Sequence, residues 1–478
     1  MKIKLILLLL VGIGVYGNTL FESFGSIGNE NSLNSRVSLN GANASYFNPA
    51  LIPLLKNRTD VSFFILHQNL DITYKNRPKG SDITERIYDA KQMEPNGTTT
   101  PIIYKPYPTS YLKERGNLDP DNTMAYLNIG VTKELIKEKL FMGVSALIPA
   151  GSFMIMDPYF VDENEQYFSN SLRFQLYGDR LQNGSFSFSG AYFYKHFLSF
   201  GVGLTMSIAS TADTQVYVDD VVEQKLDKMR PYVVADTNFI PHLAVLFKTS
   251  KNFFITSTVH FEYKNTIDIK TKTMFFDYEN KDGDKFNEQT VGFTYYYEPL
   301  RFSLGFNWEI LPEFLTIMSS VLYSRWSTYI SRVNKVPSQT WYDVISANIG
   351  SKLFLDIGDL SFDFSYIPTP VPAQTGRTNY VDNSQVGFAF SWGRLFVFSF
   401  MKFNLSANFQ FHYLIPRSVT KNLNQKYAVI DEFPDSVDSK TGEYIEDSRG
   451  FQSNNPGYPG FGSSGLIFAG GLNLSFEL

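Results

Sequence analysis

The sequence contains no cysteine, and this absence excludes several kinds of site at once. A chain of 478 residues without a thiol has no disulfide framework, no thiolate metal site, no cysteine nucleophile and no lipid-anchored N-terminal cysteine. The absence also suits a protein that crosses an oxidising compartment unfolded, where free thiols would mispair.

The sequence also lacks a large excess of positive or negative charge, and it has few long hydrophobic runs. The formal net charge is −5, and no basic stripe of the kind that nucleic acid requires is present, so nucleic acid is not expected as a partner. Beyond the N-terminus, no apolar run approaches the roughly 20 residues of a transmembrane helix. A protein of this sequence that resides in a membrane must therefore cross it with strands.

The compact apolar run at the N-terminus predicts a signal peptide. Lys2 and Lys4 precede an apolar stretch from Leu5 to Val15, and cleavage is expected after Gly17. The alternative is a transmembrane anchor, but the stretch is well short of the ~20 residues that a spanning helix needs. We expect a signal peptide over 1–17.

What the sequence does contain is aromatic residues and a two-residue alternation. Aromatic side chains make up 16% of the chain, with 43 Phe and 29 Tyr, which is typical of barrels with aromatic girdles at two membrane interfaces. Apolar and polar residues alternate along most of the chain, clearly so over 198–208, 301–309 and 403–412. A period of two sends successive side chains to opposite faces of a strand.

A soluble β-sandwich also alternates, with its apolar face inward. Here the polar phase is uniformly small or polar, the strands are often ten residues or longer, and they recur without helices. In lipid every backbone N–H and C=O must pair within the protein, so a sheet has to close on itself. The sequence therefore predicts an all-β fold, a transmembrane antiparallel β-barrel over 61–478 whose apolar phase faces lipid and whose polar phase lines the lumen.

The alternation predicts about fourteen strands, at 61–70, 122–133, 140–149, 185–195, 198–209, 238–248, 252–276, 288–309, 314–330, 341–354, 360–366, 384–393, 396–414 and 466–478. Segment 288–309 resembles two strands, because its apolar phase changes at Pro299. Bacterial barrels have long outer loops, here including 210–237, and short periplasmic turns. Loop lengths counted from either end agree only if 288–309 is one strand, so Pro299 is predicted to mark a bulge that adds a residue.

Residues 18–60 precede the first predicted strand and are rich in Asn, Ser and Gly. They form either a disordered periplasmic tail or a plug inside the lumen. A barrel of this size leaves an interior that must be filled or must conduct water. The residues alone leave both possibilities open.

Two stretches resemble the FadL-like outer-membrane transporters, which take up long-chain fatty acids and other hydrophobic compounds. Small residues and aromatics from Gly41 lead to Asn48, Pro49 and Ala50, a motif similar to the family's N-terminal hatch. A later stretch resembles the family's late loop through Thr369, Pro370, Arg377 and Asp382. In this loop Val381 stands where the family often has Pro, and Gln385 stands near the usual position of an Arg.

The resemblance implies a fourteen-stranded barrel in the bacterial outer membrane, with an N-terminal lumen plug over 18–60. Its expected surroundings and partners are outer-membrane lipid, lipopolysaccharide, the barrel-assembly machinery and hydrophobic small molecules, either fatty acid or hydrocarbon. The implied function is passive uptake, in which ligand passes from the outer loops into the lumen and leaves sideways through an opening at a kinked strand, expected within 122–149. The alternative is a FadL-like scaffold barrel that serves protein secretion or adhesion.

The candidate ligand contacts are aromatic residues of the hatch and the outer loops: Tyr46, Phe47, Phe153, Tyr159 and Phe160. The candidate polar residues of the lumen, which would bind hatch or ligand or form ordinary ion pairs, are Arg301, Glu309, His260, Glu262, Asp363 and His412. An enzyme is not expected, because the chain has five His and no Gly-x-Ser-x-Gly elbow. No cofactor or metal is expected either, since the acidic loop from Asp277 lacks the Glu that completes an EF-hand.

Overall fold

The protein is described from a computed structural model, in which the sheet dominates the fold. The structure describes residues 19–39, 41–55, 57–75, 91–93, 99–101, 122–150, 174–181, 184–220, 225–275, 285–331, 334, 336–337, 339–375, 378, 380–398, 401–421 and 460–477. Among them, no helix is long and apolar enough to cross a membrane. The predicted signal peptide lies outside these residues.

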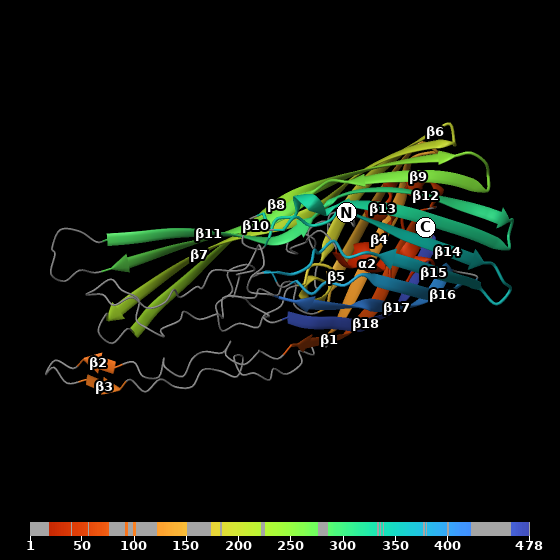
Figure 1. The fold of residues 1–478 in the computed structure, drawn as a ribbon. Coiled ribbons are helices and arrows are strands. Elements are labelled where there is room, and N and C mark those ends of the chain that lie inside the picture. The colour runs from red at the N-terminus through yellow and green to blue at the C-terminus, as the bar shows by residue number, and fades with distance from the viewer. Residues whose placement is uncertain are drawn as a thin grey trace.

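One large antiparallel sheet forms the wall (Figure 1). Its strands are β1 (Arg58–Tyr74), β4 (Asn122–Ile136), β5 (Leu140–Pro149), β6 (Ser185–Tyr194), β7 (Leu198–Asp220), β8 (Lys225–Lys248), β9 (Phe253–His260), β10 (Tyr263–Phe275), β11 (Lys285–Glu298), β12 (Leu300–Leu311), β13 (Leu315–Arg325), β14 (Val344–Leu353), β15 (Asp359–Ile367), β16 (Gln385–Val397), β17 (Lys402–Thr420) and β18 (Gly460–Glu477). A separate hairpin joins β2 (Lys91–Met93) to β3 (Thr99–Pro101).

Most wall strands pair with their neighbours in sequence, but β9 pairs with β12 instead of β10, and β10 pairs with β11 and over four residues in parallel with β7. β1 pairs with β18 along its whole length, from Arg58 opposite Glu477 to Tyr74 opposite Phe461. β7 also pairs with β8, the last strand in the order, and this ladder closes the sheet into a barrel. Because β9 is continued by β10, and β11 by β12, the sheet of sixteen strands is a barrel of fourteen. The predicted number and direction of the strands are confirmed.

The strand predicted over 288–309 is interrupted at Pro299, but the bulge lies elsewhere. Glu298 faces Tyr263 and Arg301 faces His260, so the same register continues past the proline. The register shifts between Asn265 and Thr266, where Tyr295 is the extra residue of β11. The prediction of a bulge at Pro299 is therefore wrong by four residues. Proline lacks the N–H that a ladder needs, so it interrupts the strand without adding a residue.

The hairpin of β7 and β8 is longer than the sequence pattern predicted. The two strands hold 23 and 24 residues, and they remain paired through most of 210–237, which was predicted to be an outer loop. A transmembrane strand needs only about 9–11 residues. Beyond the bilayer a strand can stay paired without apolar alternation, so periodicity did not detect this extension, which is visible in Figure 1.

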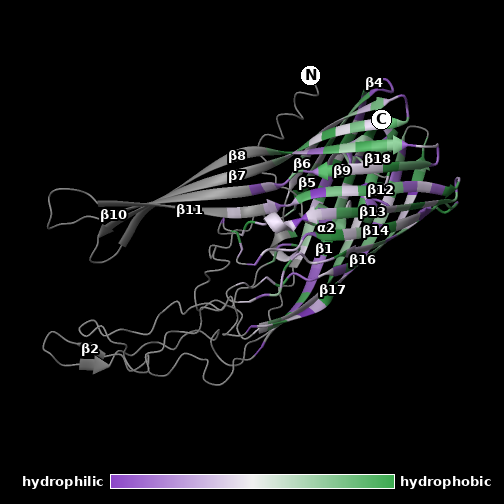
Figure 2. Ribbon diagram, turned by 45° about the horizontal axis from the view of Figure 1, so that its top comes forward, coloured by the Kyte–Doolittle hydropathy of each residue, from purple (hydrophilic) through white to green (hydrophobic). Residues whose placement is uncertain are grey.

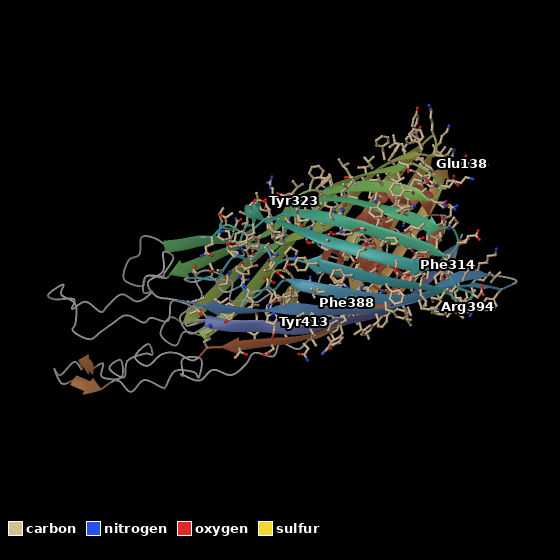
Figure 3. The ribbon with its side chains drawn as sticks, turned by 45° about the vertical axis from the view of Figure 1, so that its right-hand side comes forward. Glu138, Phe314, Tyr323, Phe388, Arg394 and Tyr413 are labelled. Atoms are coloured by element: carbon tan, nitrogen blue, oxygen red, sulfur yellow. The ribbon has the colours of Figure 1, made fainter. Side chains whose placement is uncertain are left out.

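The wall carries its apolar side chains outward, as predicted. On β7 the exposed fractions of Phe200, Val202 and Leu204 are 49%, 54% and 42%, whereas Ser199 and Thr205 are buried. Hydrophobic colour covers much of the wall in Figure 2, and Phe314, Phe388 and Tyr413 lie on the barrel in Figure 3, with half or nearly half of each surface exposed. This polarity is the reverse of a soluble protein and identifies the outer surface as one that faces lipid.

The helical turns precede the wall or connect its strands. They are α2 (Thr19–Phe24), η1 (Ser32–Asn34), α3 (Ala44–Phe47), η2 (Pro49–Leu54), η5 (Gly178–Leu181) and η6 (Trp326–Thr328). The first four belong to residues 19–55, which we call the N-terminal segment. Most of its described residues are buried.

Candidate functional site

The N-terminal segment contacts buried side chains from strands on every side of the barrel. Its apolar residues Leu20, Phe21 and Phe24 belong to one buried cluster with Phe64 of β1 and Tyr126 of β4. Further along, α3 and η2 contact β5, β6, β7 and β8, and η1 contacts β13, β14 and β15. β17 also contacts the segment, through hydrogen bonds donated by the side chains of Ser406, Asn408 and Gln410.

The Asn48-Pro49-Ala50 motif fixes one end of the segment to the wall. The Asn48 amide donates at 2.7 Å to the backbone carbonyl of Arg36 and at 2.7 Å to the hydroxyl of Thr256 on β9. Its Oδ1 accepts the backbone N–H of Ala50, so Asn48 caps η2, and Pro49 occupies the first turn, where no N–H is needed. The three residues of the motif are thus structural contacts between segment and strand.

Glycines on the wall provide the space for these contacts. A Cβ on Gly130 of β4 would lie 2.6 Å from the Cβ of Ala42, and one on Gly201 of β7 would lie 2.6 Å from the carbonyl carbon of Pro49. Real Cβ atoms do not approach other heavy atoms so closely. The glycines lie in the buried phase of their strands, where most other residues have side chains, and they permit a close approach of two backbones.

A buried group of charges joins α2 to β12. Glu22 lies 2.7 Å from Arg36 and 3.5 Å from Arg301, and it also accepts a hydrogen bond from the Tyr46 hydroxyl at 2.8 Å. Arg301 forms a second ion pair with Glu298. Burial alone would raise the pKa of the Glu22 carboxyl, but the two guanidinium groups and the hydroxyl outweigh it and hold that pKa below its ordinary value. Glu22 therefore remains a carboxylate.

Two histidines lie beside this charged group. The rings of His242 and His260 stack at a centroid distance of 5.0 Å, and the Tyr46 ring meets His260 edge-on at 5.3 Å. His242 also hydrogen-bonds the backbone carbonyl of Ser45 at 2.9 Å. The predicted lumen residues Arg301 and His260 are thus brought together against the N-terminal segment, as the alternation of β9 and β12 requires.

Asp363 and His412 contact the segment at two other places. The Asp363 carboxylate accepts hydrogen bonds from the side-chain amides of Asn31 at 2.9 Å and Asn34 at 2.8 Å. The His412 ring meets Phe24 edge-on at 4.5 Å. Both side chains are buried, and both anchor the segment through uncharged partners.

Two of the predicted lumen residues are differently placed. Glu262 is exposed and lies 3.4 Å from the half-buried Arg325, so it does not join the buried charges around the N-terminal segment. It lies between β9 and β10, where no strand fixes the phase of alternation. Glu309 is half-buried near the turn from β12 to β13, and it accepts the backbone N–H of Glu313 at 2.8 Å.

The late loop folds over the long-loop end of the barrel. The buried Asp382 carboxylate accepts the backbone N–H groups of Gln175 and Leu176, while Thr369 donates its hydroxyl to the carbonyl of Asp382. The backbone of Pro370 accepts the N–H of Tyr342 at 2.8 Å. Arg377 lies outside the described residues. Asp382 therefore joins the loop after β15 to the connection between β5 and β6.

Several contributors to this end were not found from the sequence. Arg417 of β17 donates to the backbone carbonyls of Asp382 and Val371, and so holds the late loop in place. Five aromatic rings pack together nearby, with one stacked pair at 3.8 Å: Tyr297, Trp326, Tyr329, Trp341 and Tyr380. Two of the chain's four Trp, Trp326 and Trp341, are buried in this cluster, whereas Trp308 is 47% exposed on the wall, so tryptophan alone does not mark the cluster in the sequence.

The aromatic candidates divide into two groups. Tyr46 and Phe47 are buried in the N-terminal segment, where their rings meet edge-on at 5.0 Å and each also contacts Phe21. Phe153, Tyr159 and Phe160 lie outside the described residues. Tyr46 and Phe47 hold the segment together, and Phe47 lines a small cavity of about 20 Å³.

The wall over 122–149, where a kinked strand is expected, is paired along most of its length. β4 pairs with β1 from Asn122 to Thr132 in one register, and with β5 from Tyr126 to Glu134 in one register. The one shift in these ladders lies between Glu134 and Ile136, beside the turn. On its other side, β5 pairs with β6 only as far as Leu147. A kink within 122–149 stays a prediction.

Among the residues that the structure describes, large cavities lie at the end of the barrel where short turns connect the strands. Three of them, of about 570, 380 and 660 Å³, share Leu54 of η2 as a lining residue. The site as a whole is therefore a barrel whose buried side chains bind the N-terminal segment. The cavities lie where that segment ends, at Leu54, next to the ends of the strands.

Solved structures share this fold. A FadL homologue of Pseudomonas aeruginosa matches with a TM-score of 0.51 and 13% identity, over 97% of this chain and 100% of its own. The toluene transporter TodX of Pseudomonas putida matches with a TM-score of 0.46 and 10% identity, over 98% and 99%. The toluene transporter TbuX of Ralstonia pickettii matches with a TM-score of 0.44 and 10% identity, over 97% and 98%. Neither a protein-family model nor a curated protein matches the sequence.

Proposed function

We propose that this chain, which has the fold of the FadL homologue, is an outer-membrane channel for passive uptake of hydrophobic molecules such as long-chain fatty acids. The observation that carries the proposal is the ring of contacts around the N-terminal segment. Buried side chains of β1, β4, β9, β12, β15 and β17 bind it through carboxylates, amides, hydroxyls and, on β12, the guanidinium of Arg301. These contacts support a plug over the predicted range 18–60.

A plugged barrel with an apolar exterior suits a hydrophobic solute better than an ion. Each CH₂ that leaves water contributes about 0.8 kcal/mol, so such a solute gains from a path that never returns it to bulk water. A general porin needs an open, charged constriction, whereas the charged groups described here are bonded to the N-terminal segment.

We propose that the lateral passage lies between β8 and β9. The ladder of these strands ends at the pair of His242 and His260. Beyond it β8 pairs with β7, while β10 pairs with β11 and briefly with β7. One more backbone hydrogen bond follows, from the N–H of Phe261 to the carbonyl of Pro241 at 3.3 Å, and Pro241 has no N–H with which to continue the ladder. A seam in the wall supports exchange between lumen and lipid at that level.

The proposal predicts saturable uptake with little ion current. Vesicles containing the purified protein should take up radiolabelled oleate and should conduct few ions. A variant without residues 19–55 should raise the ion conductance roughly tenfold or more, because barrels much wider than eight strands leave a water-filled interior. Steady ion current through the intact protein, without uptake of oleate, would exclude this function.

A second candidate, a scaffold barrel for secretion or adhesion, is favoured by one observation. β7 and β8 extend well beyond the length that a bilayer requires, and together with β10 and β11 they form a projection at the long-loop end (Figure 1). Such a projection offers strands to a protein partner. Stable capture of one defined protein by vesicles that show no oleate uptake would support this candidate.

A further inference from the structure

The three cavities at the short-turn end share an apolar floor but differ in charge. Leu54 contributes to each of them. The cavity of about 660 Å³ is lined by three glutamates, Glu134, Glu138 and Glu477. The cavity of about 570 Å³ mixes two arginines with acidic residues. The cavity of about 380 Å³ has three lysines and one carboxylate, so it alone of the three carries a surplus of positive charge.

The lysines of this third cavity are not equivalent. Lys352 is already neutralised, because it forms ion pairs with Glu30 and with Asp359, the latter at 2.9 Å. Lys248 and Lys251, at the turn from β8 to β9, have no ion pair recorded among the residues that the structure describes. The single carboxylate, Glu309, is oriented by the backbone N–H of Glu313. Two available ammonium groups therefore face the cavity against one carboxylate.

Of the other lining residues of this cavity, Asn252, Asn307 and Thr316 are polar and the remaining five are apolar. Leu39 and Leu54 of the N-terminal segment lie on one side, and Phe254, Met318 and Phe354 of the wall lie on the other. Phe254 and Met318 are themselves buried, at 5% and 2% exposure, so the apolar part lies deeper than the lysines. The lysines are the more exposed part, since Lys251 is exposed and Lys248 is half-buried. An apolar interior with a cationic rim fits a molecule with one acyl chain and one anionic head group.

We propose that this cavity binds a single-chain anionic amphiphile, with its carboxylate on Lys248 and Lys251 and its alkyl chain against Leu54, Phe254 and Met318. The inference rests on the proposed function and narrows the substrate class at this site to an ionised fatty acid rather than a neutral hydrocarbon. Short turns face the periplasm in bacterial barrels. The site is therefore a second exit, separate from the lateral passage between β8 and β9: an ionised amphiphile meets the periplasm here, whereas uncharged solutes use the lateral passage.

The experiment uses the full-length protein in lipid nanodiscs and dodecanoate that carries a photoreactive diazirine. After illumination, mass spectrometry of peptides should find label around Leu54, Phe254 and Met318. In the K248Q/K251Q variant, labelling there should fall by at least fivefold, the factor that corresponds to about 1 kcal/mol for one exposed ion pair. The matching dodecanol probe, which lacks the charge, should label these peptides weakly in both proteins.

The matched control is K137Q/K139Q, which removes two exposed lysines from the turn between β4 and β5 at the same end of the barrel. It should leave the labelling unchanged. Equal labelling in K248Q/K251Q, or equal labelling by dodecanol, would overturn the inference. If oleate uptake persists while these peptides stay unlabelled, only the exit site is refuted. If uptake itself is absent, the proposed function fails first.

Discussion

Replacing Arg301 by alanine should release the N-terminal segment from the wall. Arg301 is the cation that Glu22 of α2 shares with Glu298 of the strand, and all three side chains are at most 7% exposed. Its removal takes one of two guanidinium partners from Glu22, which keeps Arg36, and takes an ion pair from Glu298. Breaking a buried pair in this way typically costs about 3–5 kcal/mol. Hydrogen exchange of the amides in 19–39 should accelerate accordingly.

The control for this variant is Arg325→Ala. Arg325 lies at the adjacent position on β13, opposite Leu300, and pairs with Glu262 while both side chains are 37–42% exposed. An exposed pair contributes about 0–1 kcal/mol, so exchange in the segment should stay nearly unchanged. If Arg301→Ala and Arg325→Ala had the same small effect, the buried charges would not be holding the segment.

Adding one methyl group at Gly201 should displace the other end of the segment. The Cβ of Gly201→Ala would overlap the backbone nitrogen of Ala50 and lie 2.6 Å from the carbonyl carbon of Pro49. Backbone atoms cannot rotate away as a flexible side chain can, so η2 must shift as a unit. Overpacking of this kind costs about 1–3 kcal/mol. The expected result is faster hydrogen exchange over 48–55, with the strand ladders intact.

Gly190→Ala is the matched control. Gly190 lies on the neighbouring strand β6, opposite Val202, and a Cβ there would find its nearest heavy atom at 3.8 Å, an ordinary contact. Exchange over 48–55 should not change in this variant. Similar acceleration by both substitutions would show that the loss reflects general weakening of the sheet rather than contact with the N-terminal segment.

The strand plan could be predicted from sequence because lipid imposes a local rule. On β7, Phe200, Val202 and Leu204 alternate with serine, glycine and threonine, and this pattern indicates which face of the strand meets lipid. The prediction needs no information about distant residues. The same rule placed Arg301, His260, Asp363 and His412 among the buried residues. It does not extend to Glu262, which lies between two strands where the alternation has no meaning.

Features that depend on pairing between distant segments could not be predicted in this way. The extra residue at Tyr295 is visible in the register with β10, whereas in the sequence Pro299 is the more conspicuous irregularity. Arg417 and Asp382 are separated by 35 residues, and the contact between them uses a backbone carbonyl, which leaves no trace in residue types. Likewise, the lysines of the exit cavity are grouped by the closure of the barrel and by the position of Leu54.

Lipid contact of the apolar phase can be measured directly, because the chain has no cysteine of its own. Single cysteines at Phe302, 46% exposed, and at the next residue, Ser303, 2% exposed, can each carry a spin label in protein reconstituted in lipid. The label at 302 should collide freely with oxygen dissolved in the bilayer, and the label at 303 should be shielded from it. A shielded label at 302 together with a lipid-accessible label at 303 would contradict the outward apolar face, and with it the membrane barrel.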